Sequence, residues 1–241
     1  MTQKNLAILA FGAHPDDVEL SAGGTLATHI AQNHLCGIVD LTRGELGTRG
    51  NAENRRSEAA ESARILGVSM RENLDLGDGF FHESRESLLS VIRVIRQHKP
   101  QVVLANAISD RHPDHARAAS LVSRACFLSG LNKIEIFHEG VLLPAHRPQS
   151  IYHYIQDYNT TAHLIVDISA HFEIKMKAVM AFNTQFYDPT SLEPETPIST
   201  PLFLEFLRGR AIEFGRIIGC QFAEGFTCER PPGTHSFIEL L

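Results

Sequence analysis

Short apolar runs alternate along this chain with longer segments of helical character, and this alternation constrains the fold more than any other feature. The runs at residues 6–12, 36–41 and 102–105 are short and apolar, which predicts buried strands. Strands that alternate with helices of about 10–15 residues are typical of a parallel sheet covered on both faces. We therefore expect an α/β fold: a single-domain Rossmann-like sandwich with a mostly parallel sheet and helices on both faces.

The remaining elements follow from periodicity, glycine and proline. Two later strands are expected at 150–154 and 164–168. The helices are expected at 23–33, 54–66, 87–98, 114–128, 171–183 and 201–217. The glycine-rich stretch 43–50 predicts a loop, and the proline-rich stretch 188–201 predicts an extended connection. The sequence shows no internal repeat, so we expect one domain over 1–241.

The charge of the chain argues against a polyanionic partner. It has 22 Lys and Arg against 28 Asp and Glu, a formal net charge of −6, so its field repels nucleic acid and anionic lipid. The N-terminal apolar run is too short for a signal peptide, and no stretch reaches the roughly 20 apolar residues of a membrane span. The four cysteines form no CxxC pair, and Cys36 and Cys126 lie in apolar segments, which favours reduced, buried thiols. We expect a cytoplasmic protein with no nucleic-acid or membrane partner.

The residues that carry chemistry follow two of the expected strands. The first strand runs into the motif AHPDD at 13–17, where a dinucleotide-binding protein would have G-x-G-x-x-G, and this disfavours a nicotinamide enzyme. The strand at 102–105 leads in the same way to DRHPDH at 110–115. Each motif on its own also suits a turn whose Asp caps the next helix. Two such motifs, each placed just after a strand, favour convergence on one ion, because three N/O ligands with an open position are the layout of a catalytic zinc site.

At this point the chain resembles a known family, the LmbE-like (PIG-L) zinc-dependent N-acetylglucosamine deacetylases. The segments FGAHPDDVE, IVDLTRGELGTRG, NRRSEAAESARILG, DRHPDHARAA, HLIVDIS and QFAEGF occur in this order across almost the whole chain. The set is most similar to the bacillithiol-pathway branch of the family, which implies hydrolysis of GlcNAc-malate to GlcN-malate and acetate. The family's hexamers, built as trimers of dimers, imply a homo-oligomer with a small-molecule glycoside substrate.

The resemblance also implies a metal site with a base beside it. His14, Asp17 and His115 match the metal ligands of the family, and Asp16 matches its general base. Two histidines and one carboxylate suit Fe²⁺ as well as Zn²⁺, so the pattern leaves the choice of metal open.

Further residues are assigned by the same resemblance. His112 matches the histidine that acts as acid or electrostatic stabiliser, and Asp114 matches the carboxylate that orients it. Arg55 and Arg147 match two arginines near the substrate. Because a dicarboxylate substrate of an acidic protein needs bidentate donors, the loop arginines at 43 and 49 are further candidates.

One position departs from the family pattern. Close relatives have a mobile tyrosine, proposed to stabilise the oxyanion, before the last long helix, and Leu202 stands there in this chain. Tyr187 is the nearest tyrosine, so the residue that stabilises the oxyanion stays unassigned.

The sequence leaves two alternative functions open. The first is a metal hydrolase acting on another N-acetylglucosaminide or on a thiol-conjugate amide, because only the pocket loops decide between these substrates. The second is a non-catalytic zinc- or sugar-binding protein. Asp16 argues against the second, because a binding site needs no free carboxylate beside its ligands.

Overall fold

Seven strands form one mostly parallel sheet in the order β3-β2-β1-β4-β7-β9-β8. This is a computed structural model, and it describes residues 5–236 and 238. The parallel strands are β1 (Ile8–Gly12), β2 (Cys36–Asp40), β3 (Met70–Asn73), β4 (Val102–Ala105) and β7 (Ser150–Tyr154). β9 (Ala223–Cys228) runs antiparallel between β7 and β8 (Leu164–Asp167). The predicted α/β class with a mostly parallel sheet is confirmed.

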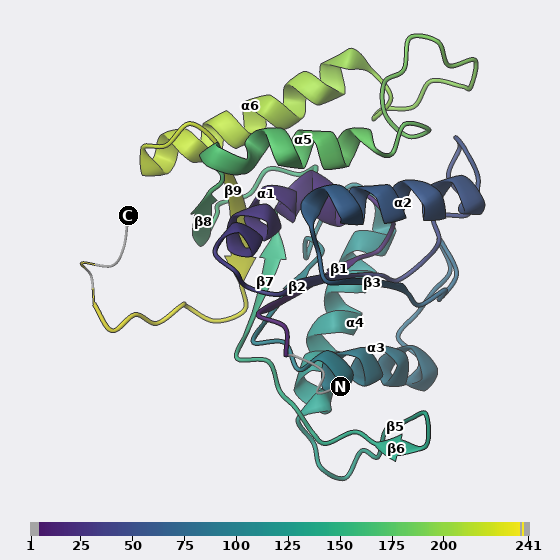
Figure 1. The fold of residues 1–241 in the computed structure, drawn as a ribbon, viewed down its shortest axis with the longest axis vertical. Helices are drawn as coiled ribbons and strands as arrows, with labels where there is room; N and C mark the ends of the chain where they lie inside the picture. The colour runs from purple at the N-terminus through teal and green to yellow at the C-terminus, as the bar shows by residue number, and fades with distance from the viewer. Residues whose placement is uncertain (1–4, 237, 239–241) are drawn as a thin grey trace.

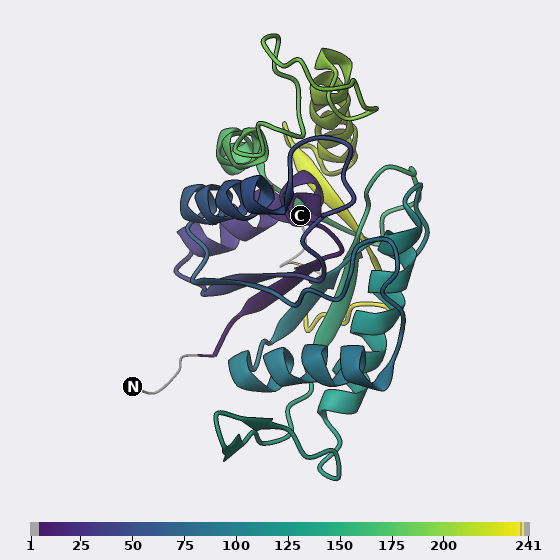
Figure 2. The same ribbon diagram turned by 90° about the vertical axis from the view of Figure 1, so that its right-hand side faces the viewer.

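Helices cover both faces of this sheet (Figure 1, Figure 2). α1 (Asp17–Ala31) and α2 (Ala52–Leu66) lie on one face, and α3 (Arg85–His98) and α4 (Pro113–Ser129) lie on the other. α5 (Phe172–Met180), preceded by a 3₁₀ turn at Ser169–His171, packs outside α1 and α2, and α6 (Pro201–Ile218) packs on β8 and β9. Within the described chain no helix combines the length and apolarity needed to cross a membrane.

The two faces of β1 separate two hydrophobic cores. Leu9 and Phe11 belong to a cluster shared with α3 and α4, whereas Ile8 and Ala10 belong to one shared with α1. Every residue of β1 is buried, as expected for a central parallel strand covered on both sides. A buried strand of this kind holds the loop after it at a fixed place.

α1 begins six residues earlier than the sequence indicates. A start at residue 23 was expected, and this was wrong because the helix begins at Asp17, directly after the AHPD turn, so that Gly23 and Gly24 lie in its interior. Gly24 is explained by packing: a Cβ atom there would lie 2.6 Å from Ile168 Cδ1. Close contact between α1 and the residue after β8 therefore accounts for a glycine inside this helix despite its low helix propensity.

Four strands were not predicted. β3 and β9 carry charged residues, and β5 (Phe137–His138) and β6 (Val141–Leu142) form a separate two-stranded hairpin. The charged residue Glu224 of β9 is buried, and such a residue hides the apolar pattern of a strand.

The contact at Gly24 predicts opposite effects of the same substitution at two helical glycines. Gly24→Ala will lower the free energy of unfolding by about 1–3 kcal/mol, because Ile168 leaves no space for a methyl group. Gly209→Ala in α6, which meets nothing within 4 Å, will raise it by up to about 1 kcal/mol through helix propensity. Urea denaturation of both variants measures this, and a shift in the same direction for both would contradict the packing argument.

Candidate active site

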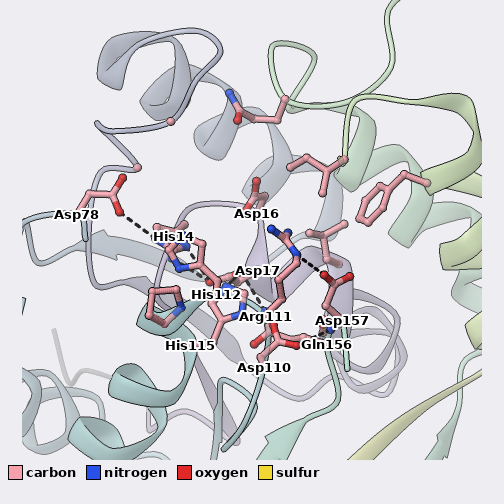
Figure 3. Close-up of a pocket in the computed structure, with 18 of the residues that line it drawn as sticks. His14, Asp16, Asp17, Asp78, Asp110, Arg111, His112, His115, Gln156 and Asp157 are labelled. Carbon is pink, nitrogen blue, oxygen red and sulfur yellow. Dashed lines mark hydrogen bonds and ion pairs between the residues drawn. The ribbon is translucent and has the colours of Figure 1, made fainter. Parts of the chain in front are cut away.

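The candidate site lies where the connections leave β1 and β4 in opposite directions. From β1 the chain continues to β2 and β3 on one side, whereas β4 and β7 lie on the other. Ligands of open parallel sheets bind at this switch point, outside the carboxyl ends of the strands. The motifs at 13–17 and 110–115 follow β1 and β4, and both line a pocket of about 430 Å³ (Figure 3).

Asp17 lies between histidines from the two motifs. Its Oδ1 is 3.0 Å from His115 Nε2, and its Oδ2 is 3.6 Å from His14 Nδ1. The side-chain amides of Asn106 and Gln156 donate to the same carboxylate at 3.0 and 3.1 Å. Burial alone would raise the pKa of Asp17, but the two histidines hold it well below its ordinary value. The structure thus brings the three predicted ligands together in a buried group.

A second carboxylate orients each of these imidazoles through its other nitrogen. His14 Nε2 is 3.0 Å from Asp78 Oδ1, and His115 Nδ1 bonds to Asp110 Oδ2. The nitrogens left facing Asp17 are therefore Nδ1 of His14 and Nε2 of His115. Carboxylates that hold the outer nitrogen of a histidine are the usual partners of metal-binding imidazoles.

The spacing and charge of this group fit a divalent cation. Ligand nitrogens of His14, His112 and His115 lie within 4.8 Å of one another, and the Asp17 carboxylate faces two of these imidazoles, with Oδ1 3.0 Å from His115 Nε2 and Oδ2 3.6 Å from His14 Nδ1. Burial lowers the pKa of both histidines, but the surrounding carboxylates outweigh it, leaving His14 raised well above its ordinary value and His115 at about 9. A site that attracts two positive charges onto imidazoles can hold a divalent ion instead.

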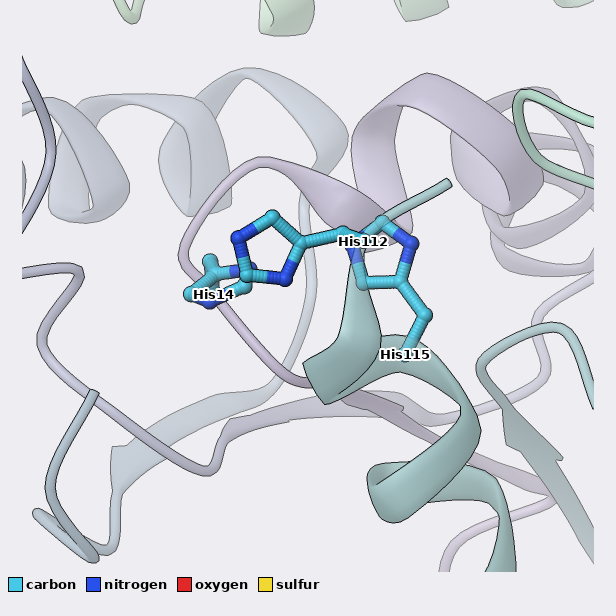
Figure 4. A group of neighbouring side chains, drawn as sticks. All are labelled: His14, His112 and His115. Carbon is cyan, nitrogen blue, oxygen red and sulfur yellow. The ribbon is translucent and has the colours of Figure 1, made fainter. Parts of the chain in front are cut away.

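His112 completes the group of three imidazoles (Figure 4). Its ring centroid is 4.6 Å from that of His14 and 5.2 Å from that of His115. Its Nδ1 accepts the backbone N–H of Asp114 at 3.2 Å, so the proton of the neutral ring is on Nε2. Burial and the two neighbouring histidines lower the pKa of His112. The ring is therefore set up to donate a hydrogen bond from Nε2 rather than to bind a metal through it.

The carboxylate of Asp114 does not orient His112, the role that the sequence had predicted for it. Its oxygens accept from the Gly79 N–H at 2.8 Å and from Arg117 Nη1 at 2.7 Å, and Oδ2 lies 3.5 Å from His14 Nε2. His112 is oriented instead by the backbone N–H of Asp114. This corrects the predicted role, and the reason is that α4 begins at Pro113, which makes His112 the capping residue of the helix.

Asp16 lies beside the ligand group without joining it. It has the positive φ angle of 127°, a strained backbone conformation that functional sites often hold. Arg55 Nη1 is 3.2 Å from Asp16 Oδ2. Burial raises the pKa of the Asp16 carboxyl to about 7, and Arg55 opposes the shift. Arg55 crosses Gly44, where a Cβ atom would lie 2.8 Å from Arg55 Nη2, so the glycine-rich loop leaves room for this pair.

The other predicted arginines lie elsewhere. Arg147 stacks on Phe127, 4.3 Å from the ring centroid, and donates to the Phe127 carbonyl in a different cavity. Arg43 pairs with Asp75 on the surface, and Arg49 is buried against the segment 186–193. The expectation that Arg147 contacts the substrate is corrected, because its guanidinium is held on α4 instead.

α6 supplies an apolar wall to the pocket rather than a tyrosine. Phe203, Phe206 and Leu207 line it, whereas Leu202 points outward and is 71% exposed. Tyr187 is 37% exposed and is not among the residues that line the pocket in the described chain. His112, whose Nε2 carries a proton, therefore lines the pocket as a hydrogen-bond donor where no tyrosine does.

Several site residues were missed by the sequence argument. Asp78 lies between two glycines with positive φ, in a loop that carries no strand or helix signal. Asn106 is the first residue after β4, and Gln156 follows β7 closely, so their positions at strand ends were the available signal. Arg111 lines the pocket and pairs with Asp157 (Figure 3).

Comparisons with known proteins agree with this site. Residues 9–126, which include both motifs, match the GlcNAc-PI de-N-acetylase family, PIG-L. The chain is 31% identical over 228 residues to diacetylchitobiose deacetylase of Thermococcus kodakarensis, covering 90% of this chain and 81% of that protein.

Solved structures extend the likeness. The conserved protein TT1542 of Thermus thermophilus has a TM-score of 0.85 at 34% identity, over 96% of this chain and 98% of that one. N,N'-diacetylchitobiose deacetylase of Pyrococcus horikoshii, in complex with its inhibitor MPG, has a TM-score of 0.76 at 28% identity, over 93% and 83%.

The fold and the site define an α/β enzyme with a histidine–carboxylate centre suited to a divalent ion. The sequence comparisons then identify the family: the chain belongs to the PIG-L or LmbE-like deacetylases.

The ligand assignment predicts a selective loss of metal. His115→Ala will reduce zinc affinity by more than the roughly 10–100-fold typical of an outer partner, because it removes the nitrogen that faces Asp17. His163→Ala, at an exposed histidine outside the pocket, is the matched control and will leave affinity unchanged. Zinc content after dialysis against a chelator measures both, and a full equivalent retained by His115→Ala would remove it from the ligand set.

Proposed function

We propose that this protein removes the acetyl group of GlcNAc-malate, giving GlcN-malate and acetate in bacillithiol biosynthesis, with zinc as its metal. The observation that carries the proposal is the placement of Asp16 and His112. One is a carboxylate and the other an N–H donor, and both line the pocket beside the ligand group without belonging to it. Amide hydrolysis needs both groups, whereas a metal-binding site alone needs neither.

His14, Asp17 and His115 would hold the metal ion. When bound, it supplies Lewis-acid polarisation of the amide carbonyl and makes a water molecule more acidic. His14 and His115 are held in orientation by Asp78 and Asp110.

Asp16 and His112 carry out the proton and charge chemistry. Asp16 accepts a proton from the attacking water, whose oxygen forms a bond to the amide carbon. Arg55 favours the carboxylate form that can accept it. His112 Nε2–H donates to the carbonyl oxygen as negative charge develops there. The proton on Asp16 then passes to the amide nitrogen, the C–N bond breaks, and acetate and the free amine are released.

The malate group of the proposed substrate calls for a cation on the pocket wall. Arg111 supplies one: its side chain is 46% exposed, and its partner Asp157 lies on the same wall. Guanidinium groups bind carboxylates in a bidentate way. Arg111 therefore takes the role that the sequence had given to Arg147.

The setting of the reaction is part of the proposal. All four cysteines are free, and Cys36 and Cys126 are buried, which supports a reducing compartment such as the cytoplasm. A homo-oligomer is supported by exposed apolar side chains on the β5–β6 hairpin, where Phe137, Val141 and Leu142 are each more than half exposed.

A second candidate is deacetylation of an N-acetylglucosaminide without malate. Two of the similar proteins are named for diacetylchitobiose, and the aromatic side chains of α6 on the pocket wall suit the apolar face of a second sugar. The first candidate is preferred because Arg111 lines the pocket, and a neutral sugar has no carboxylate for this guanidinium to bind.

Amine release from GlcNAc-malate, diacetylchitobiose and free GlcNAc distinguishes these substrates, measured on metal-stripped protein with and without Zn²⁺. We expect zinc-dependent turnover that is fastest with GlcNAc-malate. Arg111→Met will raise KM for the malate glycoside without raising it for GlcNAc, and Arg147→Met will change neither. Equal turnover of all three sugars would discard the malate assignment, and no turnover by zinc-loaded protein would discard the deacetylase.

Asp16→Asn separates the base from the ligands. Asparagine tolerates the positive φ of this position better than alanine does, and it leaves the ligand group intact. We expect kcat to fall roughly 10²–10⁴-fold, the usual contribution of general base catalysis, with full zinc content. If zinc content falls in parallel with kcat, Asp16 is a ligand and its assignment as base is wrong.

A further inference from the structure

A buried carboxylate from β9 accepts hydrogen bonds from the backbone in the middle of α1. Glu224 Oε1 accepts the Gly24 N–H at 3.0 Å, and Oε2 accepts the Thr25 N–H at 2.7 Å. Lys175 Nζ of α5 pairs with Glu224 Oε1 at 2.6 Å, and both side chains are buried. This buried ion pair ties β9 and α5 to the second turn of α1. It gives a fixed point from which the first turn, with Asp17, is held.

Two cations bind the carbonyl one turn earlier. Leu20 O accepts from Lys175 Nζ at 3.0 Å and from Arg210 Nη2 at 2.8 Å. In a regular α-helix this carbonyl is the partner of the Gly24 N–H. The same turn of α1 is therefore held from both ends by charged side chains of three other elements.

Arg210 makes a second contact, with the loop after β7. Its Nη1 donates to the Gln156 carbonyl, so one guanidinium joins that carbonyl to Leu20 O. Among the described residues no carboxylate lies within 4 Å of its nitrogens. Arg210 also packs on Phe206 and lines the pocket. A guanidinium directed at two carbonyls is suited to holding two segments of backbone in place.

Both residues that Arg210 binds act on the candidate catalytic motif. The Gln156 side chain donates to Asp17 Oδ1 at 3.1 Å and accepts from the Ala107 N–H after β4 at 3.1 Å. The Leu20 N–H donates to the Asp16 carbonyl at 2.9 Å. Arg210 thus binds the backbone carbonyls of Gln156 and Leu20. Other atoms of these two residues bind the Asp16–Asp17 pair.

We propose that Arg210 is a positioning residue that sets the Asp17 carboxylate against His115 and His14 by joining the first turn of α1 to the Gln156 loop. The inference rests on the proposed function, in which Asp17 is a metal ligand. It differs from a substrate-binding role, which the place of Arg210 on the pocket wall would also allow. In that role its loss would change KM and leave the metal site intact.

The test compares Arg210→Met, Arg210→Lys and Arg208→Met. Methionine keeps the packing on Phe206 and loses both hydrogen bonds, whereas lysine keeps the charge and can reach one carbonyl. Arg208 lies on the same helix and stacks on Phe172 and Phe222, outside the pocket, and is the matched control. Zinc affinity is measured by competition with a chromophoric chelator, kcat and KM by amine release from GlcNAc-malate at saturating zinc, and folding by urea denaturation.

We expect Arg210→Met to weaken zinc binding about 10–100-fold and to lower kcat, as loss of an outer partner of a metal ligand does. KM will stay unchanged, Arg210→Lys will lie between Arg210→Met and wild type, and Arg208→Met will match wild type. A raised KM with unchanged zinc affinity would overturn the inference in favour of substrate contact. Unchanged zinc affinity and unchanged kinetics would overturn it as well.

If Arg210→Met does not fold, Gln156→Leu takes its place in the test. This substitution removes the amide that donates to Asp17 and leaves Arg210 in place, and the inference requires the same loss of zinc affinity. Unchanged affinity would overturn the inference. Wild-type protein that binds zinc and deacetylates GlcNAc-malate keeps the proposed function whatever the variants do. Wild-type protein that binds no zinc would overturn both.

Discussion

The geometry of the site depends on one buried carboxylate, that of Asp17. It accepts the His14 backbone N–H at 2.9 Å and the side-chain amides of Asn106 and Gln156, and it faces an imidazole on either side. An ionised carboxylate is costly to bury without such partners. Its partners come from the loops after β1, β4 and β7, so a change in the spacing of those strands would unpair it.

The fold meets this requirement at the switch point of its parallel sheet. β1 and β4 are hydrogen-bonded neighbours with Ala10 opposite Leu104, so the loops that follow them start side by side. α1 begins immediately at Asp17, which leaves Asp16 in a strained turn and directs its carboxyl to the pocket beside Arg55. The outer helices α5 and α6 then hold α1 through Lys175 and Arg210.

The sequence predicted the parallel sheet and the two motifs, because apolar strands and the polar residues after them are local signals. It could not predict which groups the ends of long side chains contact in the folded protein. Arg147 and Arg111 are both near motif or loop residues, yet one stacks on Phe127 and the other lines the pocket. Asp78 and Glu224 are single carboxylates whose partners are 64 and 200 residues away at His14 and Gly24. Their roles exist only once the chain has folded.

The most direct test of this account is anomalous scattering at the zinc edge from crystals grown with zinc. We expect one strong peak in the pocket, bonded to His14, Asp17 and His115, with Asp16 and His112 close by but outside bonding distance. A peak bonded to His112 or Asp16 would contradict the assignment of acid, base and ligands. Absence of a peak at this group, in protein that folds normally, would contradict the metal centre itself.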